Sequence, residues 1–361
     1  MLSYAIFVFK VGCSQRIRKR KAATRSMNYA ALDLHERTVQ CVLKNQDGRI
    51  VKESKTVKDE GRILSFLEGT DASVVMESGR NHQHIYDVLK ERGYDVTVAH
   101  PLMVKAIAYA KVKTDRVDAR VLADLLRADM IPESYVPGRD IREIRDLVRR
   151  RHYMVKLRTM QKNKVHAELA TRWLKYEGDP FTEDGKNYLR SLAIDAVNDY
   201  LETIEFLNRK IHQLDEKVRR VVESDRYAKL LMTVPGISYY SALLISSEIA
   251  DIKRFPDHEH LCSYAKLSPG VRQSGETQHT SKSVGNSLMN WIMIQCTRIH
   301  VRRYDSAITR FYQQVSKRRG EKVAIVAARK KADAGDLHHA EGGTSLQAGW
   351  LTARVPWGHA P

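Results

Sequence analysis

Four acidic residues stand where their carboxylates could act together on a metal ion. Asp33 follows the apolar run AAL, and Glu77 follows the apolar run VVM. Asp115 and Asp118 lie three residues apart in KVKTDRVDAR, a spacing that puts both side chains on one face of a helix. Because Mg²⁺ and Mn²⁺ prefer oxygen ligands, four converging carboxylates could hold such ions. Two ions held about 4 Å apart can activate a nucleophile and stabilise a leaving oxygen in phosphodiester chemistry.

Each acid also has a structural interpretation when it is taken alone. Asp115 could cap the start of a helix, with Asp118 at the third helical position as a weak capping box. Asp33 could accept a hydrogen bond from a loop amide. The residues themselves leave these alternatives open, because convergence requires a fold that brings two strand ends and one helix together.

The pattern of residues 27–128 predicts elements that would position the acids. It predicts an α/β layer with a partly parallel sheet, in which ligand sites collect at strand ends. The ranges expected to form strands are 29–34, 38–45, 49–57, 73–78 and 94–100, and those expected to form helices are 58–69 and 82–92, with more helix after residue 100.

The chain is strongly basic, with 61 Lys and Arg against 43 Asp and Glu and a formal net charge of +18. Such an excess favours a polyanionic partner, most often a nucleic acid. Nine Lys and Arg lie within 142–164, in a region whose pattern predicts helix. We predict that Arg149, Arg150 and Lys156 contact an RNA or DNA backbone, and charge does not distinguish the two. A basic protein without such a partner is the alternative.

A heptad repeat follows the basic segment and predicts a coiled-coil seam. A seam this regular suits an identical partner, so we expect self-association. The alternative is an antiparallel pair with the basic helix of the same chain. The apolar positions are spaced three and four residues apart in turn: Val197, Tyr200, Ile204, Leu207, Ile211, Leu214, Val218 and Val221.

A second compact region begins near residue 228. VPGISYYSALLIS places Gly236 in a tight turn before an apolar helix, which predicts a helix-hairpin-helix. In such a device backbone N–H groups meet a phosphate, so Gly236 is expected at a DNA backbone, with plain packing as the alternative. A polar loop at 268–287 and an apolar helix follow, giving a mostly helical C-terminal domain.

The first residues do not have the pattern of a signal peptide or a membrane span. LSYAIFVF is too short to cross a bilayer, and the basic run RIRKRK follows it instead of preceding it. Residues 1–26 are expected to be a disordered extension. The four cysteines have no metal-ligand spacing, which indicates reduced thiols and a cytoplasmic protein.

Several segments together resemble a known family. ALDLHE, VVMESGR and KTDRVDAR resemble, in order and spacing, the Asp-Glu-Asp-Asp signature of a bacterial insertion-sequence transposase family. VPGISYYSALLISSEIADIKRF, YAKLSPGVRQSG and SKSVGN resemble its C-terminal transposase domain, so the resemblance covers roughly 27–330. It implies a RuvC-like, RNase H-type fold for the N-terminal domain. It also implies that Asp33, Glu77, Asp115 and Asp118 bind Mg²⁺, or Mn²⁺.

The resemblance also implies a second catalytic group and several partners. It places a nucleophilic serine at Ser274, whose hydroxyl could attack a phosphodiester. Arg272, His279 and Lys282 lie along the same loop and could contact the scissile phosphate, with a solvated basic loop as the alternative. The implied partners are element-end and target DNA, a structured guide RNA, and further copies of the chain as a dimer pairing into a tetramer. In that assembly the resolvase-like domain of one protomer meets the serine domain of another.

These expectations divide the chain and define its predicted function. We expect an extension at 1–26, a RuvC-like domain at 27–128, a basic and coiled-coil region at 139–226, a serine transposase domain at 228–330 and an atypical, disordered tail at 331–361. A frameshift that replaced the family's closing apolar helix could explain the tail and could impair activity. The predicted function is DNA transposition and recombination at the nucleoid. A Holliday-junction-type endonuclease and an inactive DNA-binding relic are the alternatives.

Overall fold

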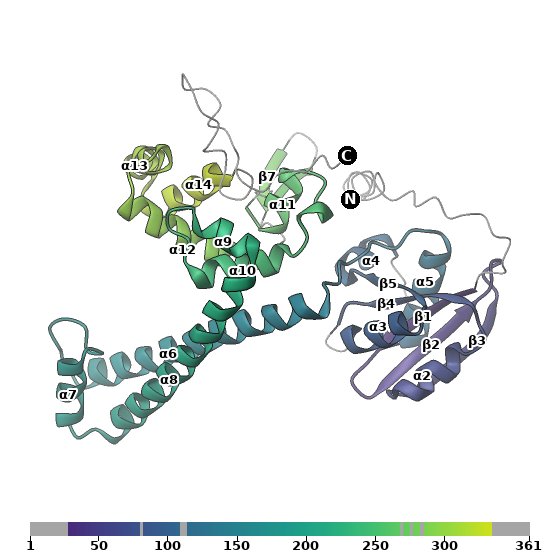
Figure 1. The fold of residues 1–361 in the computed structure, drawn as a ribbon, viewed down its shortest axis with the longest axis horizontal. Helices are drawn as coiled ribbons and strands as arrows, with labels where there is room; N and C mark the ends of the chain where they lie inside the picture. The colour runs from purple at the N-terminus through teal and green to yellow at the C-terminus, as the bar shows by residue number, and fades with distance from the viewer. Residues whose placement is uncertain are drawn as a thin grey trace. The chain divides into compact units, whose positions relative to one another are not determined.

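The computed structural model describes residues 28–79, 82–108, 114–267, 270–274, 277–281 and 285–333. The chain forms two compact units, Met1–Val136 and Pro137–Pro361 (Figure 1). The expected extension at 1–26 and the tail from residue 334 onward lie outside the described residues. The domain boundaries inferred from the sequence stay a prediction.

The first unit is built on a five-stranded mixed sheet with the order β3-β2-β1-β4-β5. β2 pairs antiparallel with β1 and β3, whereas β4 pairs parallel with β1 and β5. This confirms the predicted α/β fold with a partly parallel sheet and an RNase H-like arrangement. The strands are β1 (Asn28–Leu34), β2 (Thr38–Lys44), β3 (Ile50–Val57), β4 (Ala72–Glu77) and β5 (Asp95–Ala99).

Helices cover both faces of this sheet (Figure 1). α2 (Glu60–Leu67) and α3 (His82–Glu91) pack on one face against Ala30 and Leu32 of β1. α4 (Pro101–Ile107) and α5 (Asp115–Arg127) pack on the other face, against Ala31 of the same strand. Because side chains alternate along a strand, the central strands are apolar on both sides. Polar side chains therefore become accessible only where these strands end.

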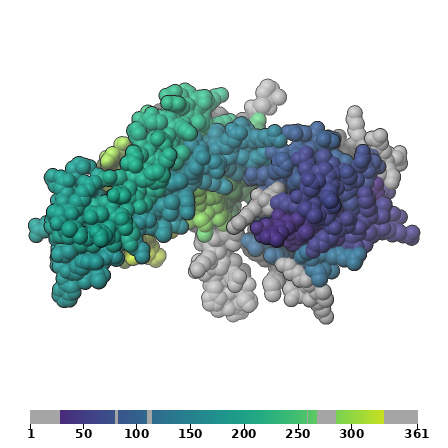
Figure 2. All heavy atoms as spheres, turned by 90° about the horizontal axis from the view of Figure 1, so that it is seen from below, coloured from purple at the N-terminus to yellow at the C-terminus, as the bar shows by residue number. Residues whose placement is uncertain are grey.

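The second unit contains a long helical hairpin (Figure 1). α6 (Arg139–Thr171) and α8 (Asp195–Ser224) run antiparallel, with α7 (Glu183–Ser191) at the outer end. Arg158 of α6 donates to Asn208 of α8, and Arg151 pairs with Asp215. The second pair lies earlier on α6 but later on α8, which fixes the antiparallel register. In the space-filling view the two helices form one continuous body (Figure 2).

The heptad seam is covered by the chain itself, so the expectation that it holds an identical partner is corrected. Ile204, Leu207 and Ile211 of α8 are 1–5% exposed, and α8 packs against α6 along the hairpin. A heptad specifies an apolar stripe but not what covers it. The 172–194 connection, which includes α7, returns the chain so that α6 covers the stripe. At the two ends Leu201 and Val222 are buried instead of their predicted neighbours, because a straight helix drifts relative to a 3.5-residue repeat.

The rest of the second unit is mostly helical, as predicted, but the polar loop at 268–287 contains a β-hairpin that sequence reasoning missed. α14 also extends beyond the break expected at residue 331. None of the helices in the described segments is long and apolar enough to cross a membrane. The elements are α9 (Arg226–Met232), α10 (Tyr239–Ile249), η1 (Ile252–Arg254), α11 (His258–Tyr264), β6 (Gly270–Ser274), β7 (Thr277–Ser281), α12 (Ser287–Arg303), α13 (Ala307–Arg319) and α14 (Glu321–Asp333).

Gly236 lies in the turn between α9 and α10, as the sequence predicts. Its φ is +96°, and a Cβ at this position would lie 2.8 Å from the carbonyl oxygen of Cys296 in α12. Glycine is therefore required both for the left-handed backbone and for the close approach of α12. The structure gives Gly236 a packing role, and its contact with DNA stays a prediction.

We expect Gly236→Ala to lower the free energy of unfolding by about 3 kcal/mol, since it combines backbone strain with overpacking. Gly178→Ala is a matched control. Gly178 has a φ of +107°, but no heavy atom of the described residues lies within 4 Å of an added Cβ. It should cost only about 1 kcal/mol of strain. Equal losses in chemical denaturation of the two variants would contradict the close-packing argument.

Candidate active site

Two of the predicted acids lie side by side at the ends of neighbouring parallel strands. The register pairs Leu32 of β1 with Met76 of β4, so the next position on each strand places Asp33 beside Glu77. Asp33 lies two residues after Ala31, and Glu77 lies two residues after Val75, so each acid is on the same face of the sheet as that residue. Ala31 and Val75 pack in the core formed with α5. The fold therefore directs both acids toward the α5 side of the sheet.

The other two acids occupy the first turn of α5. Thr114 is the N-cap of this helix, and its hydroxyl accepts a hydrogen bond from the Val117 amide. Asp115 is the first helical residue, and Asp118 follows one turn later. The alternative in which Asp115 caps the helix is therefore wrong, because the neighbouring threonine does so.

Asp33 and Asp115 meet at His35. The Nε2 atom of His35 lies 3.1 Å from Asp33 Oδ2 and 3.2 Å from Asp115 Oδ1. One ligand atom from each of the three residues lies within 4.8 Å of the others, close enough to share a metal ion. Sequence reasoning missed His35. Its position two residues after Asp33 in ALDLHE is the signal that could have found it, because residues two apart share one face of an extended chain.

The electrostatics of the cluster favour a cation. Burial raises the pKa of Asp33, and the neighbouring carboxylates of Asp115 and Asp118 raise it further, whereas His35 opposes the rise. A hydrogen bond from Lys55 lowers the pKa of Asp115. Crowded carboxylates, one of them largely buried, are the donor set that a divalent cation stabilises, so these residues fit one.

The arginines of KTDRVDAR hold α5 in place. Arg116 and Arg120 both pair with Glu53 of β3, at 2.7 and 2.6 Å. The Glu53 side chain is only 10% exposed, and the two guanidinium groups lower its pKa to about 2. This contact fixes the helix that carries Asp115 and Asp118 against the sheet.

Ser274 is the last residue of β6 in the hairpin. The β6–β7 register pairs Ser274 with Thr277 and Arg272 with His279, so the backbone brings Arg272 and His279 together two residues from the serine. Lys282 lies outside the described residues. The predicted basic residues and the serine therefore share one hairpin, except for Lys282, whose place stays a prediction.

The segment that carries this hairpin is fixed at both ends. The Asn286 amide donates to the Tyr264 carbonyl at 2.7 Å, which closes its base. The Asn286 side chain donates to a carboxylate oxygen of Glu248 at 2.8 Å, and the Tyr264 hydroxyl donates to the Glu248 carbonyl at 3.2 Å. Glu248 of α10 thus anchors both ends of the serine hairpin.

Comparison with known proteins identifies the family. Residues 30–173 match a profile described as transposase, of the IS110 type with an Asp-Glu-Asp-Asp domain. Residues 228–313 match a second profile, described as the transposase IS116/IS110/IS902 family. The chain belongs to the IS110 family of transposases. Its Asp-Glu-Asp-Asp domain implies a divalent metal.

Individual relatives of this IS110-family chain are distant. It is 23% identical to the transposase for insertion sequence element IS1111A of Coxiella burnetii, over 92% of each chain. It is 27% identical to the y4qE protein of Sinorhizobium fredii, over 61% of this chain and 56% of that protein. It is 29% identical to the pilin gene-inverting protein of Moraxella bovis, over 54% of this chain and 55% of that one. The chain thus spans just over half the length of two of these relatives.

The three basic residues predicted on α6 have different surroundings in this IS110-family chain. Arg149 pairs with Glu248 at 2.7 Å, and this carboxylate is fully buried. Arg150 is 50% exposed and lies 4.0 Å from the exposed Asp146. Lys156 is exposed. The structure therefore gives Arg149 a buried partner although its own side chain is 53% exposed, and all three residues remain at the surface.

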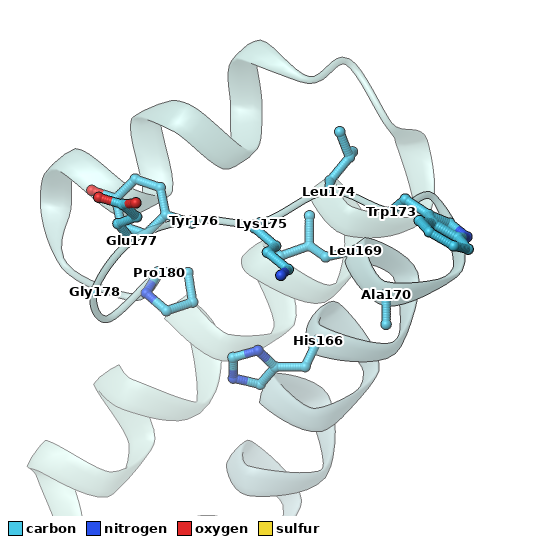
Figure 3. A pocket seen from close by; sticks show the side chains of 10 residues that line it. All are labelled: His166, Leu169, Ala170, Trp173, Leu174, Lys175, Tyr176, Glu177, Gly178 and Pro180. Carbon is cyan, nitrogen blue, oxygen red and sulfur yellow. The ribbon is translucent and has the colours of Figure 1, made fainter.

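A hollow of about 640 Å³ lies at the outer end of the α6–α8 hairpin (Figure 3). His166, Leu169, Tyr176 and Pro180 contribute to its lining. Trp173 is 94% exposed, and its ring points outward from the other labelled side chains. The lining of this hollow does not gather the acids or the serine, so the candidate site lies elsewhere.

Glu53→Gln tests how α5 is held. Because the folded state depresses the pKa of Glu53, its stabilisation is present above about pH 4.5 and is lost as the pH falls through about 2. We expect a loss of about 2 kcal/mol in the free energy of unfolding at pH 7. The difference from wild type should narrow below pH 4.5 in denaturant titrations. Glu68→Gln, at an exposed glutamate, should show no such dependence.

Arg149→Ala should lower the free energy of unfolding by about 1–2 kcal/mol, because it removes a half-exposed partner of a buried charge that Asn286 still bonds. Arg150→Ala, at the next residue, should change stability by less than about 0.5 kcal/mol. Lys156→Ala should leave stability unchanged but weaken nucleic-acid binding and reduce its salt dependence. If Arg149→Ala instead weakened binding at full stability, Arg149 would be a nucleic-acid contact.

Proposed function

We propose that this chain catalyses DNA strand cleavage and transfer for an insertion sequence, with Ser274 as the attacking group. The observation that carries the proposal is the convergence of Asp33 and Asp115, beside Glu77 and Asp118, at parallel strand ends of an IS110-family domain. Acids in this arrangement suit phosphoryl transfer at a divalent cation, Mg²⁺ or Mn²⁺.

The serine would conserve the energy of the broken DNA bond. When bound, the cation would stabilise the negative charge that develops on the transferring phosphate. The Ser274 oxygen forms a bond to phosphorus while the bond to a sugar oxygen breaks. The serine gives up its proton, and the departing sugar oxygen takes one. A hydroxyl of another DNA end then attacks the phosphoserine and releases Ser274, so the number of phosphodiester bonds is unchanged.

The basic residues of the hairpin would hold the substrate phosphate. Arg272 and His279 are paired in the β6–β7 register two residues from Ser274, and Lys282 follows in the sequence. Cationic donors beside a phosphate form charge-assisted hydrogen bonds, which would orient it for attack by the serine. The bonds of Asn286 to Tyr264 and Glu248 support this role, because they tie the base of the hairpin to α11 and α10.

The partners follow from the same proposal. Element-end and target DNA are the substrates, and a structured guide RNA pairs with them at the nucleoid. Arg150 and Lys156 on α6 offer exposed charge to these backbones. The acids of one protomer act with the serine of another in a dimer or tetramer. Since α6 covers the α8 seam, this assembly would use other surfaces.

Covalent trapping tests the proposal. Purified protein, its flanking RNA, Mg²⁺ and labelled element-junction and target DNA are mixed and analysed on denaturing gels. We expect a protein–DNA adduct that is lost in both Ser274→Ala and Asp115→Ala. Ser281→Ala, in the other strand of the same hairpin, should retain it.

A structure-specific endonuclease is the second candidate, because Asp33, Glu77, Asp115 and Asp118 all belong to the first unit, which does not contain Ser274. It would cleave by attack of water. Cleavage without an adduct, unchanged in Ser274→Ala, would establish it and overturn the serine mechanism. The absence of any product from wild type would leave an inactive DNA-binding protein.

A further inference from the structure

His35 is placed between acids from two different elements. Its Nε2 atom lies 3.1 Å from Asp33, at the end of β1, and 3.2 Å from Asp115, at the start of α5. His84 offers a contrast in the same unit, since its Nε2 atom lies 3.1 Å from Glu60 as part of an exposed pair. Both histidines have a carboxylate neighbour, but the three-residue cluster that could share an ion includes His35.

The atoms that face one another in this cluster are distinct from those with other partners. Asp115 turns Oδ1 toward His35, whereas its Oδ2 accepts a hydrogen bond from Lys55 at 3.0 Å. Asp33 turns Oδ2 toward the same nitrogen. Lys55 therefore occupies one oxygen of Asp115 and leaves the other directed at the centre. The converging set is two carboxylate oxygens and one imidazole nitrogen.

We propose that His35 is a ligand of the divalent cation through Nε2, together with Asp33 and Asp115. A centre made only of carboxylates suits Mg²⁺, whereas an imidazole nitrogen shifts the preference toward transition-metal ions. The centre therefore selects Mn²⁺ over Mg²⁺. This inference rests on the proposed function only in requiring a divalent cation at these acids, and it deepens that function by naming the ion.

A different role for His35 predicts a different nitrogen environment. A protonated imidazole that only bridges the two carboxylates would have no lone pair on Nε2 for the ion. A bound Mn²⁺ would then have oxygen ligands alone. Metal spectroscopy separates the two roles without any catalytic turnover.

The experiment uses the full chain with Mn²⁺ alone as the probe. Mn²⁺ binding is titrated by electron paramagnetic resonance, and pulsed measurements detect nitrogen bound to the ion. We expect the electron spin echo of Mn²⁺ bound to wild type to be modulated by a nitrogen nucleus, which is called nitrogen modulation below. The pattern of this modulation should change when the protein is labelled with ¹⁵N-histidine. Because this comparison uses wild type only, a variant that fails to fold cannot obscure it.

Variants then assign the signal to one residue. His35→Asn should abolish the nitrogen modulation and reduce the preference for Mn²⁺ over Mg²⁺ by at least about tenfold, measured as the ratio of dissociation constants. His84→Asn should change neither quantity. Asp115→Asn should weaken Mn²⁺ binding, which places the ion at this cluster.

Two results would overturn the inference. One is a bound Mn²⁺, sensitive to Asp115→Asn, that shows no nitrogen modulation in wild type. The other is no Mn²⁺ binding at all. Neither measurement involves DNA or Ser274, so nitrogen modulation without a protein–DNA adduct would reject the proposed serine chemistry and leave the role of His35 intact.

Discussion

The second unit depends on one buried charge, the carboxylate of Glu248. Its side chain is fully buried, so the loss of hydration costs several kcal/mol unless partners replace the water. Arg149 of α6 supplies two guanidinium nitrogens, and Asn286 supplies an amide. Tyr264 and Arg145 bond the main-chain oxygen of the same residue. Because these partners come from separate segments, the cost of leaving Glu248 unpaired holds α6, α10 and the base of the serine hairpin in one arrangement.

Much of the first unit could be predicted because its signals are local. Apolar alternation and turn residues specify strands and helices within a few residues of their observed bounds. The places of Asp33 and Glu77 then follow from the rule that parallel strands end at the same sheet edge. The aspartates of α5 were predictable from their helical spacing. That Thr114 caps this helix is also local, but a neighbouring aspartate offers the same chemistry, and the sequence alone does not rank the two.

The features that escaped prediction depend on contacts between distant residues. Nothing near Arg149 in the sequence shows that Glu248, 99 residues away, will bury its carboxylate against it. The heptad of α8 specifies a stripe, and only the folded chain shows that α6 covers it. The hairpin around Ser274 has polar strands without apolar alternation, so its pairing has no period-two signal. The sequence does not indicate His35 as a site residue, because a single histidine becomes a candidate ligand only when the fold brings Asp115 beside it.

The length of α6 gives the Glu248 anchor a mechanical consequence. At 1.5 Å per residue, about 33 Å of helix separates Arg149 from Thr171, the last residue of α6. A tilt of about five degrees at the anchor would swing that end through about 3 Å, the length of a hydrogen bond. The position of the hairpin tip is thus far more sensitive to the angle of α6 than the position of Arg149 is. The Glu248 carboxylate that holds α6 at Arg149 also bonds Asn286 at the base of the serine segment.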